Sequence, residues 1–436
     1  MTETRVGLLG LGTIGTGVAR LLIEHQDLLS GRLDKPLRLV RVCDRDEGRG
    51  GDLDLTGVDR SYDANEVIQA DDIDIVIELI GGYEPARSFV ATAIEHGKHV
   101  VTANKALIAK HGEELFAQAA EKGVAIGFEA AVGGGIPCLK ALREGLAANA
   151  VQSVYGILNG TCNYILTKME NEGLAFDAVL AQAQELGYAE ADPTFDIEGV
   201  DTAHKLAILA AMAFGSKIKF DEVFTEGISR ITPDDIDSAR ELGYRIKLLG
   251  IAKPHDSAVE MRVHPTLVPL QAQIAQVSDS YNAVQVSGDY VEHTMYFGRG
   301  AGEKPTASAV VADVMDIARA MPDGIKYLPP PMGAPQAMRR DLLTWPMEEV
   351  ESEYYLRLMV KDQPGVLAAV TRILGVNGIS IEAFIQKERH QTQAVPVIVL
   401  THAVREGDLR SAMDAIVELP TVEGEPLMLR IERFGA

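Results

Sequence analysis

An acid and a lysine on one predicted helix are the first residues of this sequence that could do chemistry. Asp201 and Lys205 are four residues apart, which places both side chains on the same helix face. Such a pair is usually a modest, exposed ion pair. Here the helix continues through an apolar run, 206–212, so the pair is predicted to be partly enclosed. A partly desolvated lysine beside a carboxylate can be a tuned proton donor.

A glycine-rich turn near the N-terminus indicates a phosphate-binding loop. Gly10, Gly12 and Gly15 follow a strand-like run, 5–9, and lead into a predicted helix, 18–29. The first glycine permits a tight turn, the second lets the backbone approach a pyrophosphate, and the third allows close packing of helix on strand. The helix N-terminus offers unpaired N–H donors to an anion. The pattern predicts a dinucleotide site, and a purely structural glycine turn is the alternative.

Polar residues also follow the next predicted strands. Asp44 ends the strand 37–43, where an acid can bond ribose hydroxyls, although the gap from the glycines is longer than usual. Asp44 would disfavour a 2′-phosphate, whereas the adjacent Arg45 could accept one, so the choice between NAD and NADP stays open. Lys105 follows the strand 99–102. Ligands of open α/β sheets sit beyond the carboxyl ends of strands, so Lys105 could contact the cofactor or an acidic substrate. A solvated loop acid and a surface lysine are the alternatives for Asp44 and Lys105.

The order of predicted elements divides the α/β chain into four parts. Strands alternate with helices over 1–132, which predicts a Rossmann-type, doubly wound domain, completed by residues 300–320. Helices mixed with strands predict an α+β domain over 133–320. A proline-rich linker, 321–352, follows. Over 353–436 the order strand, helix, strand, strand, helix, strand predicts a separate ferredoxin-like domain.

Composition narrows the possible environments and partners. The formal net charge of −22 would repel a phosphate backbone, so nucleic acid is not an expected partner. We expect neither a membrane span nor a signal peptide, because no apolar run approaches the length of a span and the N-terminus lacks a basic region before an apolar one. The three cysteines have no paired spacing, which fits a reducing, cytoplasmic environment.

Seven motifs, found in the same order, resemble homoserine dehydrogenase. They occupy residues 10–15, 103–105, 129–137, 158–163, 187–193, 201–205 and 298–308. The loop 362–365 and the element order around it resemble an ACT domain, which many bacterial homoserine dehydrogenases carry. The resemblance implies an enzyme that interconverts L-homoserine and L-aspartate 4-semialdehyde with NAD(P), on the route to threonine, methionine and isoleucine. It also implies that 133–320 is a catalytic and dimerisation domain, in a homodimer or homotetramer.

The same resemblance implies roles for individual residues. Lys205 is the proton donor to the carbonyl oxygen during reduction, and Asp201 is its partner. Glu190 holds the substrate, and Asp196 lies where the family has another substrate-contacting acid. Lys105 contacts both cofactor and substrate. Further cofactor contacts are expected from Thr13, Ile14 and Gly302. Ala191 and Phe195 differ from the residues that are common at these positions in the family, which puts the detailed substrate contacts in doubt.

Two further ligand sites follow from the resemblance. The glycine-rich loop 129–136 matches a monovalent-cation site, usually for sodium, with ligands from Glu129, Val132, Gly134 and Ile136. An ordinary strand-to-helix turn is the alternative. In the ACT-like domain, an amino-acid effector, threonine, would meet residues at the turn and near the end of the following helix, namely Asp362, Gln363, Pro364, Gly365 and Asn377. A ligand-free oligomerisation domain is the alternative there.

Two rival functions stay open on sequence alone. The chain could be a Rossmann reductase that acts on another amino-acid semialdehyde, or a catalytically inactive amino-acid sensor. The presence of Glu190 with Lys205 argues against the first, and the intact lysines argue against the second.

Overall fold

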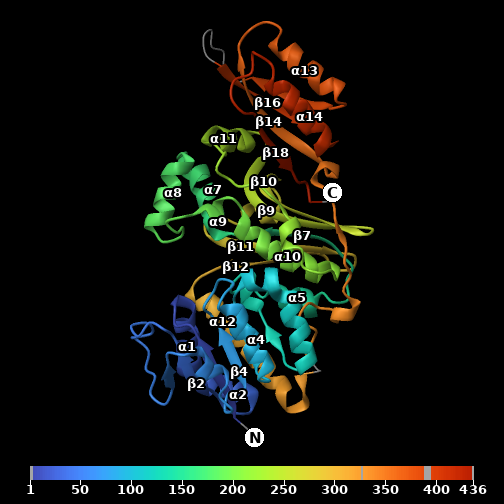
Figure 1. The fold of residues 1–436 in the computed structure, drawn as a ribbon. Helices are drawn as coiled ribbons and strands as arrows, with labels where there is room; N and C mark the ends of the chain where they lie inside the picture. The colour runs from blue at the N-terminus through green and yellow to red at the C-terminus, as the bar shows by residue number, and fades with distance from the viewer. Residues whose placement is uncertain (1–2, 326–327, 387–393, 435–436) are drawn as a thin grey trace.

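The computed structural model describes residues 3–325, 328–386 and 394–434. The N-terminal domain, a middle domain and the C-terminal domain follow one another along the long axis of the molecule (Figure 1). Among the described residues, no helix is both long and apolar enough to cross a membrane.

Six parallel strands form the N-terminal sheet, in the order β3-β2-β1-β4-β5-β6. Their bounds are β1 Thr4–Leu9, β2 Leu37–Cys43, β3 Asp59–Ser61, β4 Ile75–Glu78, β5 His99–Thr102 and β6 Ile126–Gly127. Helices cover the sheet, so β4 is buried along its whole length. These helices are α1 Thr13–Glu24, α2 Gln26–Leu33, α3 Ala64–Ile68, α4 Ala86–Glu95, α5 Lys105–Lys122 and α12 Glu303–Ala320. The strand order reverses between β1 and β4, where a doubly wound sheet opens a crevice at its carboxyl edge. The predicted Rossmann-type fold is confirmed.

The first crossover differs from the sequence prediction in one detail. Instead of a single helix over 18–29, α1 ends at Glu24 and α2 begins at Gln26, because His25 leaves the helical region at φ −103° and ψ 15°. α1 buries one whole face, whereas α2 buries only Leu29, so little packing holds the second segment in line with the first. α12 packs against α1 and brings a segment distant in sequence into the N-terminal domain.

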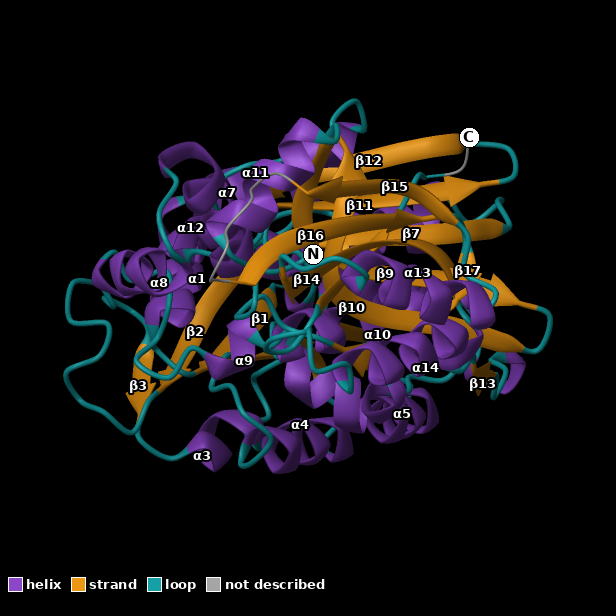
Figure 2. Ribbon diagram, turned by 90° about the horizontal axis from the view of Figure 1, so that it is seen from above, coloured by secondary structure: helices purple, strands orange, loops and turns teal. Residues whose placement is uncertain are grey.

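A mixed sheet forms the middle domain, in the order β12-β11-β7-β9-β10. Its strands are β7 Val151–Ile157, β9 Tyr244–His255, β10 Ala258–Pro269, β11 Tyr281–Gly288 and β12 Glu292–Arg299, with the short β8 Phe224–Thr225 and β13 Leu343–Thr344 beside β10. The helices are α6 Cys138–Lys140, the π-helix Ala141–Gly145, α7 Gly160–Glu172, α8 Phe176–Glu185, α9 Thr194–Ile197, α10 Val200–Phe214 and α11 Pro233–Glu241. Figure 2 shows the long strands crossing the molecule, and α10 packs on β7, β9 and β10.

The C-terminal domain has the element order that the sequence predicts, with one short additional strand, β17, before its second helix. Its strands are β14 Glu351–Lys361, β15 Ile381–Gln386, β16 Ala394–Thr401, β17 Val404–Arg405 and β18 Leu427–Ile431, and its helices are α13 Val366–Val376 and α14 Glu406–Val417. Short 3-10 helices occupy Glu129–Ala131, Phe220–Glu222, Gln273–Gln276, Met321–Asp323, Gln336–Met338 and Met347–Glu349.

The sequence predicts a separate C-terminal unit, whereas the structure joins its sheet to that of the middle domain. β18 pairs in parallel with β10 through Thr266 with Arg430 and Leu267 with Ile431. The two sheets form one continuous sheet, in which β10, β18 and β14 are neighbours. The predicted linker is also partly ordered on the middle domain, because Leu343 pairs with Ala258. The C-terminal domain is therefore fastened to the sheet on which α10 packs.

Candidate active site

The glycine-rich turn lies at the carboxyl end of β1. Gly10 has a φ of 94°, and a Cβ there would lie 2.7 Å from the carbonyl oxygen of Leu79. A Cβ on Gly15 would overlap the carbonyl oxygen of Gly10. Thr13 and Ile14 form the first turn of α1, and no side chain caps the helix at Gly12. The N–H groups at this helix end are therefore free to meet an anion in the crevice.

The loop after β2 borders the glycine turn. The carboxylate of Asp44 accepts hydrogen bonds from the backbone N–H of Leu11 at 2.7 Å and of Asp46 at 2.9 Å. Arg45 is exposed beside it. Arg49, which the sequence analysis missed, has its guanidinium 3.8 Å from Asp44 and 3.6 Å from the Cβ position of Gly12. No motif marks Arg49; only the folding of this loop brings it to the glycine turn.

Two lysines share one buried carboxylate at the crevice. Lys105 is the first residue of α5, directly after β5, and its Nζ lies 3.0 Å from Oδ1 of Asp201. Lys205, one helical turn beyond Asp201 on α10, donates to Oδ2 of Asp201 and to the carbonyl oxygen of Leu158, both at 2.6 Å. The side chain of Lys105 is 34% exposed, against 11% for Lys205 and 5% for Asp201. The predicted Asp–Lys pair is thus enclosed, and Lys105 is its more accessible cation.

The charges of this cluster set its protonation. Burial would raise the pKa of Asp201, but Lys205 and Lys105 outweigh it and hold this pKa well below its ordinary value. Burial would lower the pKa of Lys105, but Asp201, Asp196 and Glu190 outweigh it, so the pKa of Lys105 is raised. Asp201 is therefore ionised and Lys105 protonated at neutral pH. Such a site can stabilise an oxyanion and supply a proton to it.

Asn159 orients both acids of the cluster, and the sequence analysis gave it no role. Its Nδ2 donates to Asp201 at 2.8 Å and to Asp196 at 2.7 Å, while its Oδ1 caps α7 by accepting from the N–H of Cys162 at 2.8 Å. Burial and the charge of Asp201 raise the pKa of Asp196 above its ordinary value. The fixed amide thus brings Asp196 and Asp201 side by side.

An aromatic stack forms one wall of the site. His204 on α10 lies between Phe220, at a ring distance of 3.8 Å, and Phe195, at 5.4 Å. The ammonium of Lys105 lies 5.7 Å from the Phe195 ring. Tyr83, from the loop after β4, places its hydroxyl 3.4 Å from Nε2 of His204. The stack therefore joins the two domains that enclose the crevice, and nothing in the local sequence pattern marks it.

Glu190 affects the pKa of Lys105 less than Asp201 and Asp196 do. Its side chain is exposed, in the loop between α8 and α9, and it acts on Lys105 through its charge. The side-chain amide of Gln184 holds its backbone carbonyl at 3.0 Å. Glu190 is thus an exposed carboxylate near Lys105, outside the buried cluster.

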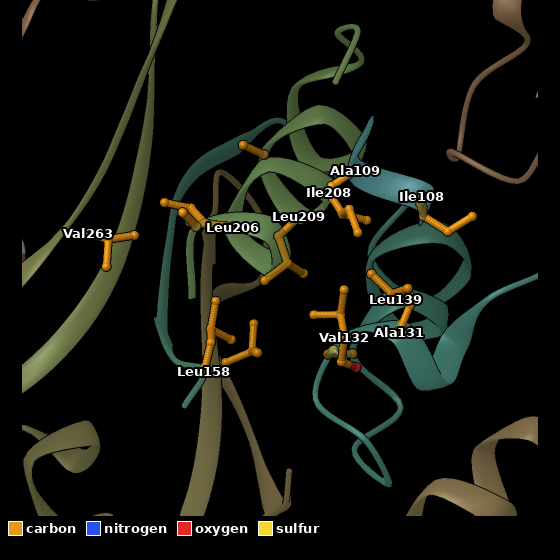
Figure 3. Close-up of a cluster of buried hydrophobic side chains, with 14 of the residues drawn as sticks. Ile108, Ala109, Ala131, Val132, Leu139, Leu158, Leu206, Ile208, Leu209 and Val263 are labelled. Atoms are coloured by element: carbon orange, nitrogen blue, oxygen red, sulfur yellow. Dashed lines mark hydrogen bonds between the residues drawn. The ribbon is translucent and has the colours of Figure 1, made fainter. Parts of the chain in front are cut away.

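Apolar packing fixes the helix that carries Asp201 and Lys205. Figure 3 shows Leu206, Ile208 and Leu209 of α10 in one cluster with Ile108 and Ala109 of α5. All the residues of this cluster belong to the buried core, including Ala131, Val132, Leu139, Leu158 and Val263 (Figure 3). Lys105 is the first residue of α5 and Asp201 the second of α10, so the packing of these helices sets the distance between the two lysines.

The predicted cation loop packs against the segment before α12. Gly134 has a φ of 55°, and a Cβ there would lie 2.5 Å from the carbonyl oxygen of Gly300, two residues before Gly302. The carboxylate of Glu129 accepts from the N–H groups of Leu139 at 2.9 Å and of Lys140 at 2.8 Å. Burial and the charge of Asp313 raise the pKa of Glu129 to about 7. Val132 and Ile136 are buried in the same turn.

The predicted effector residues lie at two ends of one helix. Asp362 to Gly365 form the turn before α13, and Gly365 caps it with a φ of 94°. Asn377 caps the other end, and its Nδ2 donates to the carbonyl oxygen of Ile373 at 2.9 Å. Eleven helical residues separate them by about 16 Å. The structure therefore does not bring these residues together within one chain.

The fold and this site define the class of protein. A glycine turn at an uncapped helix end, at the reversal point of a doubly wound sheet, is built for a dinucleotide. Two lysines on one carboxylate beside it suit a carbonyl that gains or loses hydride. The chain is an oxidoreductase that uses a nicotinamide cofactor.

Comparisons with known proteins identify the family. The family described as "Homoserine dehydrogenase, NAD binding domain" matches residues 10–129, "Homoserine dehydrogenase" matches 137–315, and "ACT domain" matches 354–421. The homoserine dehydrogenase of Pseudomonas aeruginosa is 48% identical over 100% of both chains, and that of Neisseria gonorrhoeae is 45% identical over 99% of both. A crystal structure of a homoserine dehydrogenase from Thiobacillus denitrificans superposes with a TM-score of 0.95 at 49% identity, covering 100% of this chain and 99% of the other. The chain belongs to the homoserine dehydrogenase family, and its C-terminal domain is an ACT domain.

Proposed function

We propose that the chain interconverts L-homoserine and L-aspartate 4-semialdehyde with NAD(P), in the biosynthesis of threonine, methionine and isoleucine. The observation that supports this reaction most directly is the shared carboxylate: Asp201 holds Lys105 and Lys205 together at the carboxyl edge of the nucleotide-binding sheet. Two ammonium groups at this edge suit a carbonyl oxygen that becomes an alkoxide.

The roles of the residues follow from the charge that develops. When bound, the nicotinamide supplies or accepts the hydride at the carbonyl carbon. Lys205 gives its Nζ proton to the carbonyl oxygen during reduction and recovers it from the hydroxyl during oxidation. Lys105 adds positive charge beside the same oxygen. Asp201 keeps both lysines in place, and it stays ionised throughout.

Recognition of the amino-acid part of the substrate falls to the acids around Lys105. Glu190 binds the substrate ammonium group from the periphery of the crevice, and Asp196 contacts the substrate from α9. The exposed side chain of Glu190 can move to meet a ligand, since only its backbone carbonyl is held. Replacing Glu190 with Gln is expected to raise KM for homoserine more than it lowers kcat.

The decisive experiment follows reduced-cofactor absorbance with homoserine and each oxidised cofactor in turn. We expect turnover with NADP, because two backbone N–H groups occupy the Asp44 carboxylate. The exposed Arg45, and the exposed Arg49 that lies 3.8 Å from Asp44, can turn toward a 2′-phosphate. Arg49→Ala should lower the NADP-to-NAD ratio of kcat/KM about tenfold, an effect of one charge-assisted contact. Arg38→Ala is the control, because Arg38 is exposed at the amino end of β2, away from the loop that follows the strand. Absence of turnover with both cofactors would refute the function.

A monovalent cation, sodium, is proposed at the loop 129–136. The donors fit: Glu129 and Asp313 are both buried acids, and burial raises both pKa values, so a hard cation nearby would offset their charge. Backbone carbonyls of Val132, Gly134 and Ile136 would complete the oxygen ligands. Sodium chloride should raise the melting temperature more than choline chloride at equal ionic strength, and equal effects would argue against the site.

Feedback inhibition by threonine, in a homodimer or homotetramer, is proposed for the ACT domain. Because Asp362 and Asn377 lie at opposite ends of α13, a ligand that touches both must sit between two chains. Threonine should therefore lower activity and increase the oligomer mass in sedimentation together. Asp362→Ala and Asn377→Ala should each weaken both effects.

A further inference from the structure

One short segment touches both the C-terminal domain and the active site. Glu226, Gly227 and Ile228 follow β8 and run along β10, where the N–H of Glu226 donates to the carbonyl oxygen of Val263 at 2.7 Å. None of these residues belongs to the motifs or to the catalytic cluster. We call residues 226–228 the bridging segment.

On one side, the bridging segment is held by arginines of the C-terminal domain. The carboxylate of Glu226 pairs with two arginines. Nη2 of Arg430, on β18, lies 3.1 Å from Oε1 of this carboxylate, and Nη1 of Arg430 donates to Oε2. Arg410 of α14 lies 3.4 Å from the same carboxylate. Both guanidinium groups lie over the ring of Phe224, at 5.3 and 5.6 Å. The Arg430 side chain is fully buried, and Glu406 binds it from within the C-terminal domain. Bidentate pairing of this kind fixes orientation as well as distance.

On its other side, the bridging segment packs on the loop that leads into the catalytic helix. The N–H of Ile228 donates to the carbonyl oxygen of Ile197 at 2.9 Å. A Cβ on Gly227 would overlap that same oxygen and lie 2.5 Å from the Glu198 carboxylate. Gly199 is equally confined, because a Cβ there would lie 3.0 Å from Thr225 and Val263. There is no free space between the two segments to absorb a movement.

The confined loop carries the acids of the site. Residues 197–199 connect Asp196, which accepts from Asn159, to Val200, the first residue of α10, and Asp201 comes next. A displacement of Glu226 would therefore move Asp196 and the start of α10 together. Lys205, bonded to Asp201, would follow.

We infer that Glu226 is a positioning residue for the reaction, and that through it the ACT domain sets the placement of Asp196 and Asp201. The link from Arg430 to Ile197 is a property of the fold. Its use in feedback inhibition rests on the proposed function, because a ligand of the ACT domain would act on the site by shifting β18 and Arg430.

Two substitutions test the link from its two sides. Glu226→Gln keeps the size of the side chain but removes the charge that Arg430 and Arg410 bind. Gly227→Ala leaves the ion pairs intact and pushes directly on Ile197. Each is expected to raise KM for homoserine about fivefold and to lower kcat, with the Kd of the cofactor unchanged, because the glycine turn lies in the other domain.

The matched control breaks another buried ion pair at the same boundary. Arg357 of β14 binds Asp235 of α11 at 2.6 Å, and Asp235 is fully buried, but among the described residues neither side chain hydrogen bonds to the loop 197–199. Arg357→Met should lower the melting temperature at least as much as Glu226→Gln while leaving KM and kcat at wild-type values.

The outcomes separate this inference from the proposed function. Wild-type KM and kcat in Glu226→Gln and Gly227→Ala, with only lowered melting temperatures, would overturn the link. If threonine inhibits the wild-type enzyme, Glu226→Gln should weaken that inhibition, and undiminished inhibition would also overturn it. Failure of threonine to inhibit the wild type would remove the proposed feedback, while the kinetic effects of the two variants would still support the link.

Discussion

Two buried charge clusters in this enzyme have different cations at their centre, although Lys253 also pairs with Glu432 at the rim of the second one. In the active site, Asp201 is shared by two lysines, at 2.6 and 3.0 Å. At the boundary between the middle and C-terminal domains, Arg262 of β10 binds Glu260 at 2.7 Å and Glu432 at 3.0 Å. The Arg262 side chain is 1% exposed, whereas that of Lys105 is 34% exposed. One cluster is open to a ligand, and the other is sealed.

The difference reflects what each cation can do. A guanidinium does not release its proton at any physiological pH. Its planar N–H donors bind two acceptors at once, so it suits a permanent contact between two elements. An ammonium group on a flexible stem can lose and regain a proton, so it suits a centre where charge appears and disappears. In the described part of the chain, the buried Arg262 lies where the two sheets join, and Lys205 lies where we propose that a proton moves.

Exchanging the cation type in the active site should have the largest effect. Lys205→Arg keeps the positive charge next to Asp201 but removes the transferable proton, so kcat should fall about 10³-fold, equivalent to about 4 kcal/mol of barrier. Steady-state kinetics with homoserine measure this loss, and fluorescence titration with reduced cofactor should show unchanged binding. Activity within tenfold of wild type would mean that Lys205 acts only through its charge.

Breaking the sealed cluster should affect stability instead of chemistry. Arg262→Met leaves Glu260 and Glu432 buried without their main cation, which typically costs about 3 kcal/mol of unfolding free energy. Urea denaturation measures the cost, and kcat of the folded variant should stay near wild type. Glu260→Gln with Arg262→Met should recover part of the loss, because one uncompensated charge is gone.

The sequence predicted local elements better than contacts between distant ones. The bounds predicted for β2 and β5 agree with the structure, since apolar periodicity and turn residues act over a few neighbours. The joining of the two sheets could not be predicted, because it depends on two residue pairs between β10 and β18, strands far apart in the chain. The sequence of neither strand identifies the strand with which it pairs.

Contacts between distant residues could not be predicted in the active site either. Asp201 with Lys205 was visible as a helical spacing, and the glycine turn was visible as a motif. Asn159 lies in one of the motifs that resemble the family, but no role was predicted for it. Its bonds to Asp196 and Asp201 form only when α7, α9 and α10 come together. Arg49 and Tyr83 approach the crevice by loop geometry alone. The roles predicted for individual site residues remain predictions that the variants can test.

A smaller effect is expected from Asn159→Ser, which probes how the open cluster is oriented. Serine still caps α7, but it lacks the amide that donates to Asp196 and Asp201. Loss of these bonds raises the pKa of both acids, so the acid limb of the kcat/KM profile should move to higher pH, and kcat/KM at neutral pH should fall about tenfold. Asn159→Ala loses the cap as well and should be less stable than the serine variant by about 1 kcal/mol. An unmoved acid limb in both variants would mean that the amide does not tune the acids.

Lys247 of β9 offers the finest test, because it is a buried lysine whose two bonded acceptors are not carboxylates. It is 1% exposed, and its Nζ donates to Oδ1 of Asn163 at 2.9 Å and to the carbonyl oxygen of Val277 at 2.6 Å. Burial and the charge of Arg245 lower its pKa from 10.5 to about 7, despite the opposing charges of Glu170 and Asp279.

This lowered pKa makes the stability of the protein depend on pH. Between pH 7 and 10.5 the unfolded chain holds the Lys247 proton and the folded chain does not, so this group makes stability rise with pH. The slope is at most about 1.4 kcal/mol per pH unit. Lys247→Met lacks this term, so its advantage over wild type at pH 7 should shrink steadily by pH 9 in urea denaturation. Parallel pH curves for the two proteins would show that Lys247 stays protonated, and that a buried lysine needs no carboxylate to keep its charge here.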